Sequence, residues 1–188
     1  MDPLYRWWLR RRHGGGPWAG LLQRPPDDEW VSLDLETTGL DPRQDHILSL
    51  AAVPVRDGRV WLTERFERRI RPDRGFGIES IRHHRITPGE AGTGMSVTPA
   101  VRELLQWLGS RRLLGYHLRF DLAMLASHVR ALTGFPLPNP RVELADAFAN
   151  RAMRAHPGAP ADLAFRTIAD ALGVPVLARH SALGDATT

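Results

Sequence analysis

The alternation of apolar and polar positions predicts strands in the part of the chain that begins at Trp30. Residues 31–35 have the length and apolar content of a short strand. Residues 47–55 are almost continuously apolar, which is typical of a strand that is covered on both faces. Pro54 has no backbone N–H group, so it favours a sheet edge or a bulge near the end of this second strand.

The stretch after residue 55 predicts a hairpin. Arg56-Asp57-Gly58-Arg59 places an Asp-Gly pair, which tolerates the positive φ angles of a tight turn, directly after the second strand. The apolar residues that follow would share one face of a returning strand, and they are Val60, Leu62 and Phe66. We therefore expect three antiparallel strands, in sequence order, at the start of the domain.

Helical periodicity begins near residue 98. Thr98 can cap a helix, and Pro99 suits the first helical position because proline needs no N–H partner there. The apolar stripe of this helix comprises Val101, Leu104, Leu105 and Leu108.

A strand and two more helices are predicted after this first helix. Residues 112–116 form the short strand, and a helix then begins at Asp121. The buried side of that helix comprises Leu122, Leu125, Val129 and Leu132. The last of these helices extends from about residue 163 to residue 172, because Gly173 is a common helix end.

Residues 1–28 form an extension of the domain that occupies residues 29–188. Leu4 to Leu9 and the following Arg10 to Arg12 predict a short basic, aromatic helix, which glycines and prolines then interrupt. One interpretation is a docking element for a partner, an anionic lipid surface or nucleic acid. The simpler interpretation is a helix that packs on the domain, or a frayed terminus.

Composition narrows the class of protein. The 188 residues are 43% hydrophobic and 24% charged, which indicates a globular chain with a real core. The sequence has no apolar run of about 18 residues and no secretory h-region, so we expect no membrane span and a cytoplasmic location. There is no cysteine, which excludes disulfides and thiolate metal sites. A pI near 10.7 with a net charge of +4 favours an anionic partner, although the use of arginine alone is also typical of a coding bias.

An acidic pair lies on the first predicted strand. Asp34 and Glu36 are two residues apart, so both side chains leave the same face of the strand while Leu33 and Leu35 point into the core. Two adjacent carboxylates repel each other unless a cation lies between them, and hard divalent cations prefer carboxylate oxygens. The alternative is that the pair is surface charge at the end of a strand.

Three further residues complete the candidate chemistry. Asp121 begins a helix, where an aspartate often serves only as a cap. His180 and Asp185 are spaced so that the histidine lies in the loop entering a helix and the aspartate in its first turn. A histidine beside a metal-bound water can take its proton at neutral pH. Each residue alone has an ordinary structural explanation, so the hypothesis rests on the set.

These segments resemble the DnaQ-like exonucleases of the DEDDh type, which include the proofreading epsilon subunit of bacterial DNA polymerase III. The resemblance extends from about Trp30 to Thr188. It is carried by residues 33–40, by residues 179–186, by residues 84–87, and less specifically by Asp146. It implies an α/β RNase H-like fold with a central mixed five-stranded sheet and flanking helices, a 3′-to-5′ exonuclease activity, and two Mg²⁺ or Mn²⁺ ions.

The resemblance also implies roles for individual residues. The metal ligands would be Asp34, Glu36, Asp121 and Asp185, and His180 would be the general base that deprotonates the attacking water. The residues that contact substrate would be Thr37, Thr38, Gly39, Leu40, His84, His117 and Phe120.

Two departures from the family pattern stand out. His117 follows Tyr116 where members usually have His-Asn, so we expect altered substrate handling rather than inactivity. His117 is also a rival candidate for the proton acceptor. Members continue the last helix for several turns, whereas this sequence ends three residues after Asp185, so we expect that helix to be cut short.

The sequence therefore predicts a metal-dependent exonuclease that acts on 3′ ends of single-stranded DNA, releases nucleoside 5′-monophosphates and serves proofreading or repair, with a polymerase subunit as a candidate partner. An exoribonuclease of the RNase T or oligoribonuclease type is the alternative enzyme, because 2′-OH recognition cannot be read from these motifs. The alternative outside enzymes is a degenerate, non-catalytic domain that binds nucleic acid or a polymerase.

Overall fold

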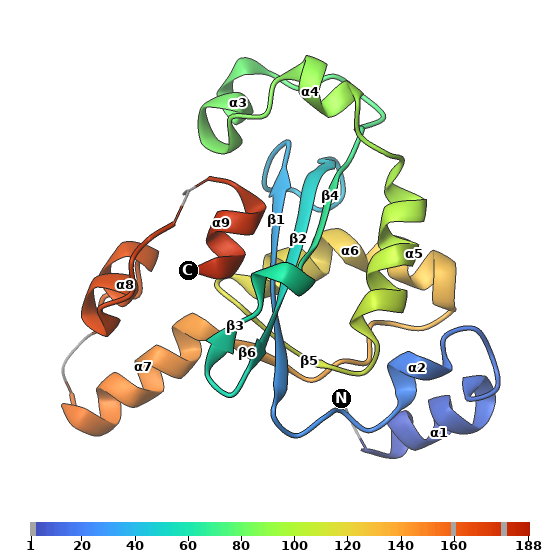
Figure 1. Cartoon of the computed structure of the whole chain (residues 1–188), viewed down its shortest axis with the longest axis horizontal. Coiled ribbons are helices and arrows are strands. Elements are labelled where there is room, and N and C mark those ends of the chain that lie inside the picture. Colours follow the sequence, from blue (N-terminus) through green and yellow to red (C-terminus); the bar gives the residue numbers. More distant parts are fainter. Residues whose placement is uncertain (1–2, 159–160, 178–179) are drawn as a thin grey trace.

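A mixed β-sheet forms the centre of the molecule (Figure 1). The computed structural model describes residues 3–158, 161–177 and 180–188. Within these ranges the sheet has six strands in the order β3-β2-β1-β5-β6, with β4 also paired to β2. The strands are β1 Glu29–Thr37, β2 Ile47–Arg56, β3 Arg59–Val60, β4 Phe66–Arg69, β5 Arg112–Gly115 and β6 Arg141–Glu143.

Strand directions follow the expected α/β pattern. β1 and β2 are antiparallel over nearly their whole length, and β5 and β6 lie parallel to β1. Asp57 and Gly58 have φ angles of 51° and 67°, so the predicted tight turn between β2 and β3 is confirmed. The expected α/β class, a central mixed sheet with flanking helices, is also confirmed, with six strands in place of the five expected.

The additional strand arises because the returning strand is split. β3 pairs with the end of β2, a 3₁₀ turn at Leu62–Glu64 interrupts it, and β4 then pairs with the middle of β2. Val60 and Leu62 are 42% and 44% exposed, whereas Phe66 is buried. The prediction that these three residues share one face of a single strand was therefore wrong, because the 3₁₀ turn at Leu62–Glu64 interrupts the strand between them.

The helices lie on both sides of the sheet and beyond its ends. They are α1 Pro3–His13, α2 Ala19–Leu22, α3 Ile78–His84, α4 Pro88–Gly92, α5 Val97–Leu108, α6 Leu118–Thr133, α7 Leu144–Ala155, α8 Phe165–Leu172 and α9 Ala182–Thr187. None of the helices in the described ranges is long and apolar enough to cross a membrane.

Two helices begin earlier than the sequence predicts. Ser96, rather than Thr98, is the N-cap of α5, so Pro99 lies within the first turn, where a missing N–H group costs no helical hydrogen bond. α6 begins three residues before Asp121 because the chain passes directly from β5 into the helix through His117. Asp121 therefore lies in the first turn of α6 and does not cap it.

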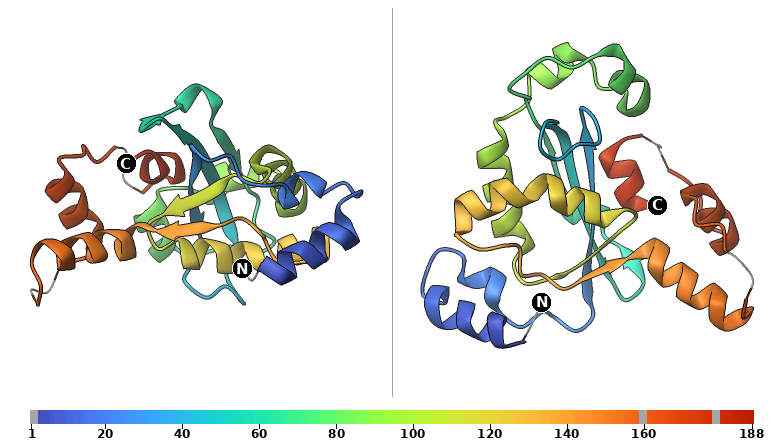
Figure 2. Two further views of the ribbon diagram at one scale, coloured as in Figure 1. Left: turned by 90° about the horizontal axis from the view of Figure 1, so that it is seen from below. Right: turned by 180° about the vertical axis from the view of Figure 1, so that it is seen from behind.

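The two faces of the sheet are covered by different helices (Figure 2). Leu33 and Leu35 belong to the main core with buried side chains of α5 and α6. On the other face, Ala51 and Val53 of β2 pack against small residues of α9, mainly Ala182 and Ala186. Because these side chains are small, α9 approaches the sheet closely on the same face from which the acidic pair projects.

The first two helices pack onto the domain. Leu9 is fully buried, and Trp18, Leu21 and Leu22 join the main core. The Trp18 indole N–H donates a hydrogen bond of 2.9 Å to the carbonyl oxygen of Leu132 at the end of α6. The described part of the extension is therefore continuous with the core, and its outward side remains open to solvent.

Candidate active site

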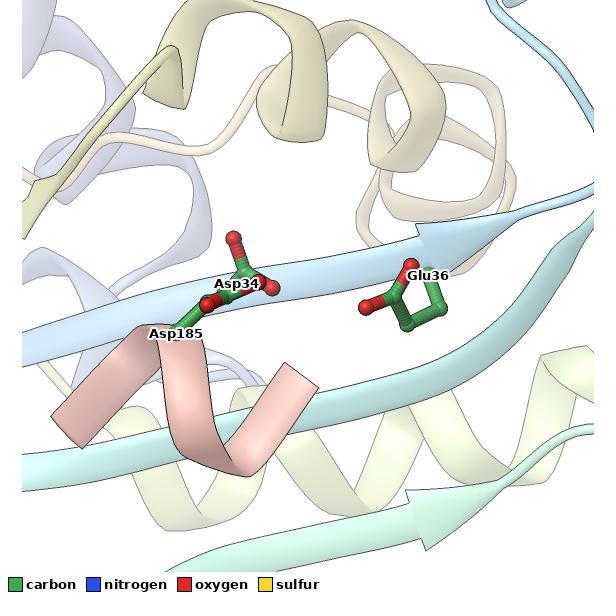
Figure 3. Close-up of side chains that lie close together, drawn as sticks. All are labelled: Asp34, Glu36 and Asp185. Atoms are coloured by element: carbon green, nitrogen blue, oxygen red, sulfur yellow. The ribbon is translucent and has the colours of Figure 1, made fainter. Parts of the chain in front are cut away.

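Three carboxylates meet between β1 and α9 (Figure 3). Asp34 and Glu36 leave the same face of β1, and Asp185 reaches them from the first turn of α9. One carboxylate oxygen from each residue lies within 4.8 Å of those of the other two. The residues opposite the acidic pair on β2 are Ala51 and Ser49, whose small side chains leave room in front of the carboxylates.

Burial and mutual repulsion change the proton affinity of this cluster. Burial is the main cause that raises the pKa of Asp34 well above its ordinary value, and the nearby charges of Asp121, Asp185 and Glu36 raise it further. The pKa of Glu36 is raised to about 7, first by burial and then by Asp185. Such a group of half-buried acids is stabilised by a bound cation, and its all-oxygen donor set suits a hard divalent ion. These residues therefore fit a Mg²⁺ or Mn²⁺ site.

Asp121 lies beside the cluster but outside the group of three. It is buried on α6, and its pKa is raised mainly by burial and also by the charges of Glu143 and Glu36. The backbone N–H of Leu35 hydrogen-bonds to its carboxylate and opposes that rise. β5 pairs with β1 only as far as Ser32, so α6 can reach the second half of β1 and set Asp121 next to it.

His180 and Asp185 occupy the positions that the spacing predicts. His180 precedes α9 with φ of 65°, and its backbone N–H donates to the Asp185 Oδ2 atom at 3.2 Å. Ser181 caps the helix, because its hydroxyl oxygen accepts a hydrogen bond of 3.1 Å from the Gly184 N–H. The loop and the first turn of α9 thus hold each other in place. Arg179, part of the same motif, lies outside the described residues.

The loop after β1 is held by Asp45. The Thr38 hydroxyl donates to Asp45 Oδ1 at 2.9 Å and accepts from the His46 N–H at 2.9 Å. The Thr37 hydroxyl donates to the Gly39 carbonyl oxygen at 2.7 Å. Both threonine hydroxyls are therefore engaged within the loop, and in this structure they shape its backbone rather than face a ligand.

Another predicted contact residue, His84, is buried near the acidic pair. It lies at the end of α3, is 3% exposed, and its Nδ1 atom accepts a hydrogen bond of 3.0 Å from the Ile86 N–H. Its pKa is lowered, first by burial and then by His83. Among the described atoms, His84 Nε2 has no hydrogen-bond partner. His84, His180 and Glu36 line one cavity of about 280 Å³.

The remaining predicted contact residues gather at a second, open cavity of about 630 Å³. Leu40, His117 and Phe120 line it, and Leu40 is 83% exposed. His117 has φ of 56°, a left-handed conformation that histidine and asparagine tolerate better than most residues. This explains why a histidine can stand where the family pattern has asparagine.

Two residues at the site were not predicted from the sequence. Glu143 ends the three-residue strand β6, and its Oε1 atom accepts a hydrogen bond of 2.8 Å from the backbone N–H of His117. Asp45 anchors the loop after β1. β6 is too short to show a strand pattern, and Asp45 lies in a loop, so neither residue had a local signal. Asp146 lies in the first turn of α7 and pairs with Arg119 at 2.8 Å.

Comparison with known protein families gives one match that covers most of the chain. A family model described as exonuclease, of the RNase T type, matches residues 31–188. The matched region contains every predicted site residue and begins two residues after the start of β1.

Individual relatives are larger proteins. A DNA polymerase III subunit epsilon-like protein of Rhodobacter capsulatus is 30% identical over 176 residues, which cover 92% of this chain and 24% of that protein. A PolC-type DNA polymerase III of Thermotoga petrophila is 27% identical over 158 residues, which cover 84% of this chain and 11% of that protein. The chain thus spans about a quarter or less of these relatives.

Solved structures show the same fold. Escherichia coli exonuclease I in complex with a dT13 oligonucleotide superposes with a TM-score of 0.68 at 20% identity, covering 85% of this chain and 39% of that one. The cell-death related nuclease CRN-4 gives a TM-score of 0.69 at 17% identity, covering 87% of this chain and 62% of that one.

Proposed function

The chain belongs to the RNase T exonuclease family, and from this premise we propose that it removes nucleotides from the 3′ end of single-stranded DNA. The products would be nucleoside 5′-monophosphates. The observation that carries the proposal is the convergence of Asp34, Glu36 and Asp185 within 4.8 Å, with Asp121 buried beside them. A cluster of this kind has little structural value without a cation, because its members repel one another.

The residues of the site have different roles in the proposed hydrolysis of the phosphodiester. Asp34, Glu36, Asp121 and Asp185 would hold two Mg²⁺ or Mn²⁺ ions, which stabilise the attacking and leaving oxygens of an in-line displacement. The imidazole of His180 takes the proton from the attacking water. The hydrogen bond from the His180 N–H to Asp185 ties this base to the metal-binding carboxylates.

We assign the terminal nucleotide to the open cavity that Glu143 lines, because the charge of Glu143 also acts on Asp121. Leu40 and Phe120 offer apolar surface for a base or sugar, and His117 offers a ring nitrogen for a hydrogen bond. Thr37, Thr38 and Gly39 would contact the nucleotide through their backbone, in a loop that Asp45 holds in place. His84 faces the cavity on the Glu36 side and supplies a further polar contact through Nε2.

The choice of DNA and of a proofreading or repair role is supported by the relatives. Two of them are named as DNA polymerase III proteins, and exonuclease I was crystallised with a DNA oligonucleotide. A polymerase subunit is therefore the partner we propose. The exoribonuclease alternative uses the same acidic cluster and differs only in what contacts the sugar.

One degradation assay tests both the direction of degradation and the preference for DNA or RNA. Matched DNA and RNA oligomers, labelled at the 5′ end, are incubated with Mn²⁺, and a second set carries a blocked 3′ end. We expect a ladder that shortens from the free 3′ end, faster on DNA, and no cleavage of blocked oligomers. Faster degradation of RNA would favour the exoribonuclease, and cleavage of blocked oligomers would contradict the 3′-end assignment.

Variants in the same assay test the cluster. Asp34→Asn keeps the size of the side chain and removes a ligand charge, so the rate should fall about 10³-fold, equivalent to several kcal/mol of transition-state stabilisation. Asp170→Asn is the matched control, because Asp170 lies on α8 in an exposed ion pair with Arg166. Full activity in Asp34→Asn would show that Asp34 is not a metal ligand in the reaction. A folded wild-type protein that binds oligomers but never cleaves them would favour the non-catalytic alternative.

A further inference from the structure

The outward side of α1 carries an aromatic and basic surface, which we call the α1 face. It consists of Tyr5, Trp7, Trp8, Arg11 and Arg12. Trp7 and Trp8 are 56% and 46% exposed, although tryptophan in a folded domain is usually well buried. The rings of Tyr5 and Trp8 stack with centroids 5.9 Å apart. The guanidinium groups of Arg11 and Arg12 lie 5.2 Å and 5.6 Å from the ring centroids of Trp7 and Trp8.

The α1 face is held rigidly on the domain. Arg6 donates to the carbonyl oxygens of Pro138 at 2.9 Å and Gln23 at 2.6 Å, and Arg10 donates to that of Leu22 at 2.5 Å. Leu9 is fully buried on the inner side of the helix. Arg6 and Arg10 therefore attach α1, whereas Arg11 and Arg12 make no hydrogen bond to the rest of the domain among the residues that the structure describes. A partner meeting this surface would not have to order it first.

A third exposed tryptophan, Trp61, shows what distinguishes the α1 face. Trp61 is 42% exposed and has the Arg56 guanidinium 5.6 Å from its ring centroid, much like Trp8 and Arg12. Arg56, however, pairs with Glu29 at 3.1 Å and Glu64 at 2.6 Å. Within the described ranges, neither Arg11 nor Arg12 has a carboxylate partner. The positive charge of the α1 face is therefore available to an anionic partner.

We propose that the α1 face binds a single-stranded stretch of nucleic acid, DNA or RNA, at a distance from the 3′ end that is being cleaved. Exposed tryptophan rings stack on unpaired bases without sequence preference, and adjacent arginines pair with phosphates. The inference rests on the proposed function only in taking nucleic acid as the substrate. Leu4, Trp7 and Trp8 also expose apolar surface on α1, so binding to a lipid surface is the competing outcome of the test.

The position of α1 predicts a dependence on substrate length. α1 and α2 lie near the start of β1, whereas the carboxylates lie in its second half (Figure 1). Glu36 lies seven positions after Glu29 along the strand, which corresponds to roughly 23 Å. A short oligomer that fills the active site cannot reach the α1 face, and a long one can contact both.

Binding without cleavage tests the proposal. Fluorescently labelled oligothymidylates of about three and about thirty nucleotides are titrated with the full chain in EDTA, where hydrolysis cannot occur. Trp7→Ala/Trp8→Ala should weaken binding of the long oligomer roughly tenfold and leave the short one unchanged. Arg11→Gln/Arg12→Gln should lower the slope of log affinity against log salt by about 0.7 for each phosphate that is no longer neutralised. Trp61→Ala is the matched control and should bind both oligomers as the wild type does.

Two other outcomes would overturn the proposal. Equal affinity of the wild type and both double variants for the long oligomer would show that α1 does not contact it. Loss of binding to phosphatidylserine vesicles, with oligomer binding intact, would identify a lipid surface instead. If the tryptophan variant does not fold, the Arg11→Gln/Arg12→Gln variant still tests the proposal, because the hydrogen bonds that attach α1 come from Arg6 and Arg10. Absence of cleavage in Mn²⁺ would refute the proposed function and leave this binding result standing.

Discussion

Asp45 occupies the space in which a side chain at position 39 would stand. A Cβ atom on Gly39 would lie 2.5–2.7 Å from the Asp45 carboxylate, closer than nonbonded atoms approach. Gly39→Ala should therefore displace Asp45 and break its hydrogen bonds to the Thr38 hydroxyl and the Asp41 N–H. We expect a loss of about 2 kcal/mol in the free energy of unfolding and a higher KM on oligonucleotides. Urea denaturation and steady-state kinetics measure the two effects.

Gly89→Ala provides the control for that substitution. Nothing lies within 4 Å of a Cβ atom built at Gly89, and the residue lies within α4. Its stability should be unchanged or slightly higher, because alanine is the better helix former. Equal stability and KM in the two variants would mean that the loop does not depend on the contact between Gly39 and Asp45.

His84 should make stability depend on pH. Burial lowers its folded pKa, so the neutral ring is favoured in the folded state and its Nδ1 atom remains an acceptor for the Ile86 N–H. The contribution to stability is complete above the ordinary pKa of about 6.5 and is lost as pH falls toward the lower folded value. The contribution of His84 to the slope of the unfolding free energy against pH cannot exceed about 1.4 kcal/mol per pH unit.

His84→Asn isolates this effect, because asparagine retains an acceptor and does not titrate. Urea unfolding at pH 5 and pH 8 should show a smaller drop in free energy at pH 5 for the variant than for the wild type. Identical pH dependence in the two proteins would mean that His84 is not held neutral by burial.

Local patterns predicted part of the site. The period of a strand sets Asp34 and Glu36 on one face, so their proximity followed from spacing alone. Their meeting with Asp185 depends on α9 reaching the sheet across small residues, which no local pattern reveals. The family resemblance supplied that expectation. The contact between Glu143 and His117 joins residues 26 positions apart and could not be predicted from either segment.

At the scale of elements, the packing of α1 makes a direct prediction about stability. Leu9 is fully buried, so Leu9→Ala should lower the free energy of unfolding by about 2–5 kcal/mol. Leu4 lies on the same helix and is 77% exposed, so Leu4→Ala should change it by less than about 0.5 kcal/mol. Urea denaturation measures both variants. A negligible effect of Leu9→Ala would mean that α1 detaches from the core in solution.

Element types were easier to predict than element boundaries. The apolar run of β2 and the stripe of α5 are strong local signals, and both elements form, although α5 begins two residues earlier than expected. The start of α6 was missed because His117 adopts a left-handed conformation that lets the chain turn at once into the helix. The division of the returning strand depends on pairing with two parts of β2, which is tertiary information.

At the scale of the whole molecule, one face of the sheet forms most of the hydrophobic core and the other face carries the proposed metal site. The face with α5 and α6 holds most of the core, and the face with α9 holds the acidic cluster. The pKa of Glu36 is raised to about 7, which means that the ionised carboxylate destabilises the metal-free folded protein. A bound cation would remove this destabilisation. Since the acids must lose protons to bind metal, binding should release protons near neutral pH.

Calorimetric titration with Mn²⁺ near pH 6.5 tests this account most directly. The wild type and Asp170→Asn should both show saturable binding whose heat depends on the ionisation enthalpy of the buffer, as proton release requires. Asp34→Asn should bind at least tenfold more weakly, because one carboxylate of the cluster is lost. Unaltered Mn²⁺ binding in Asp34→Asn would contradict the metal site, and with it the proposed mechanism.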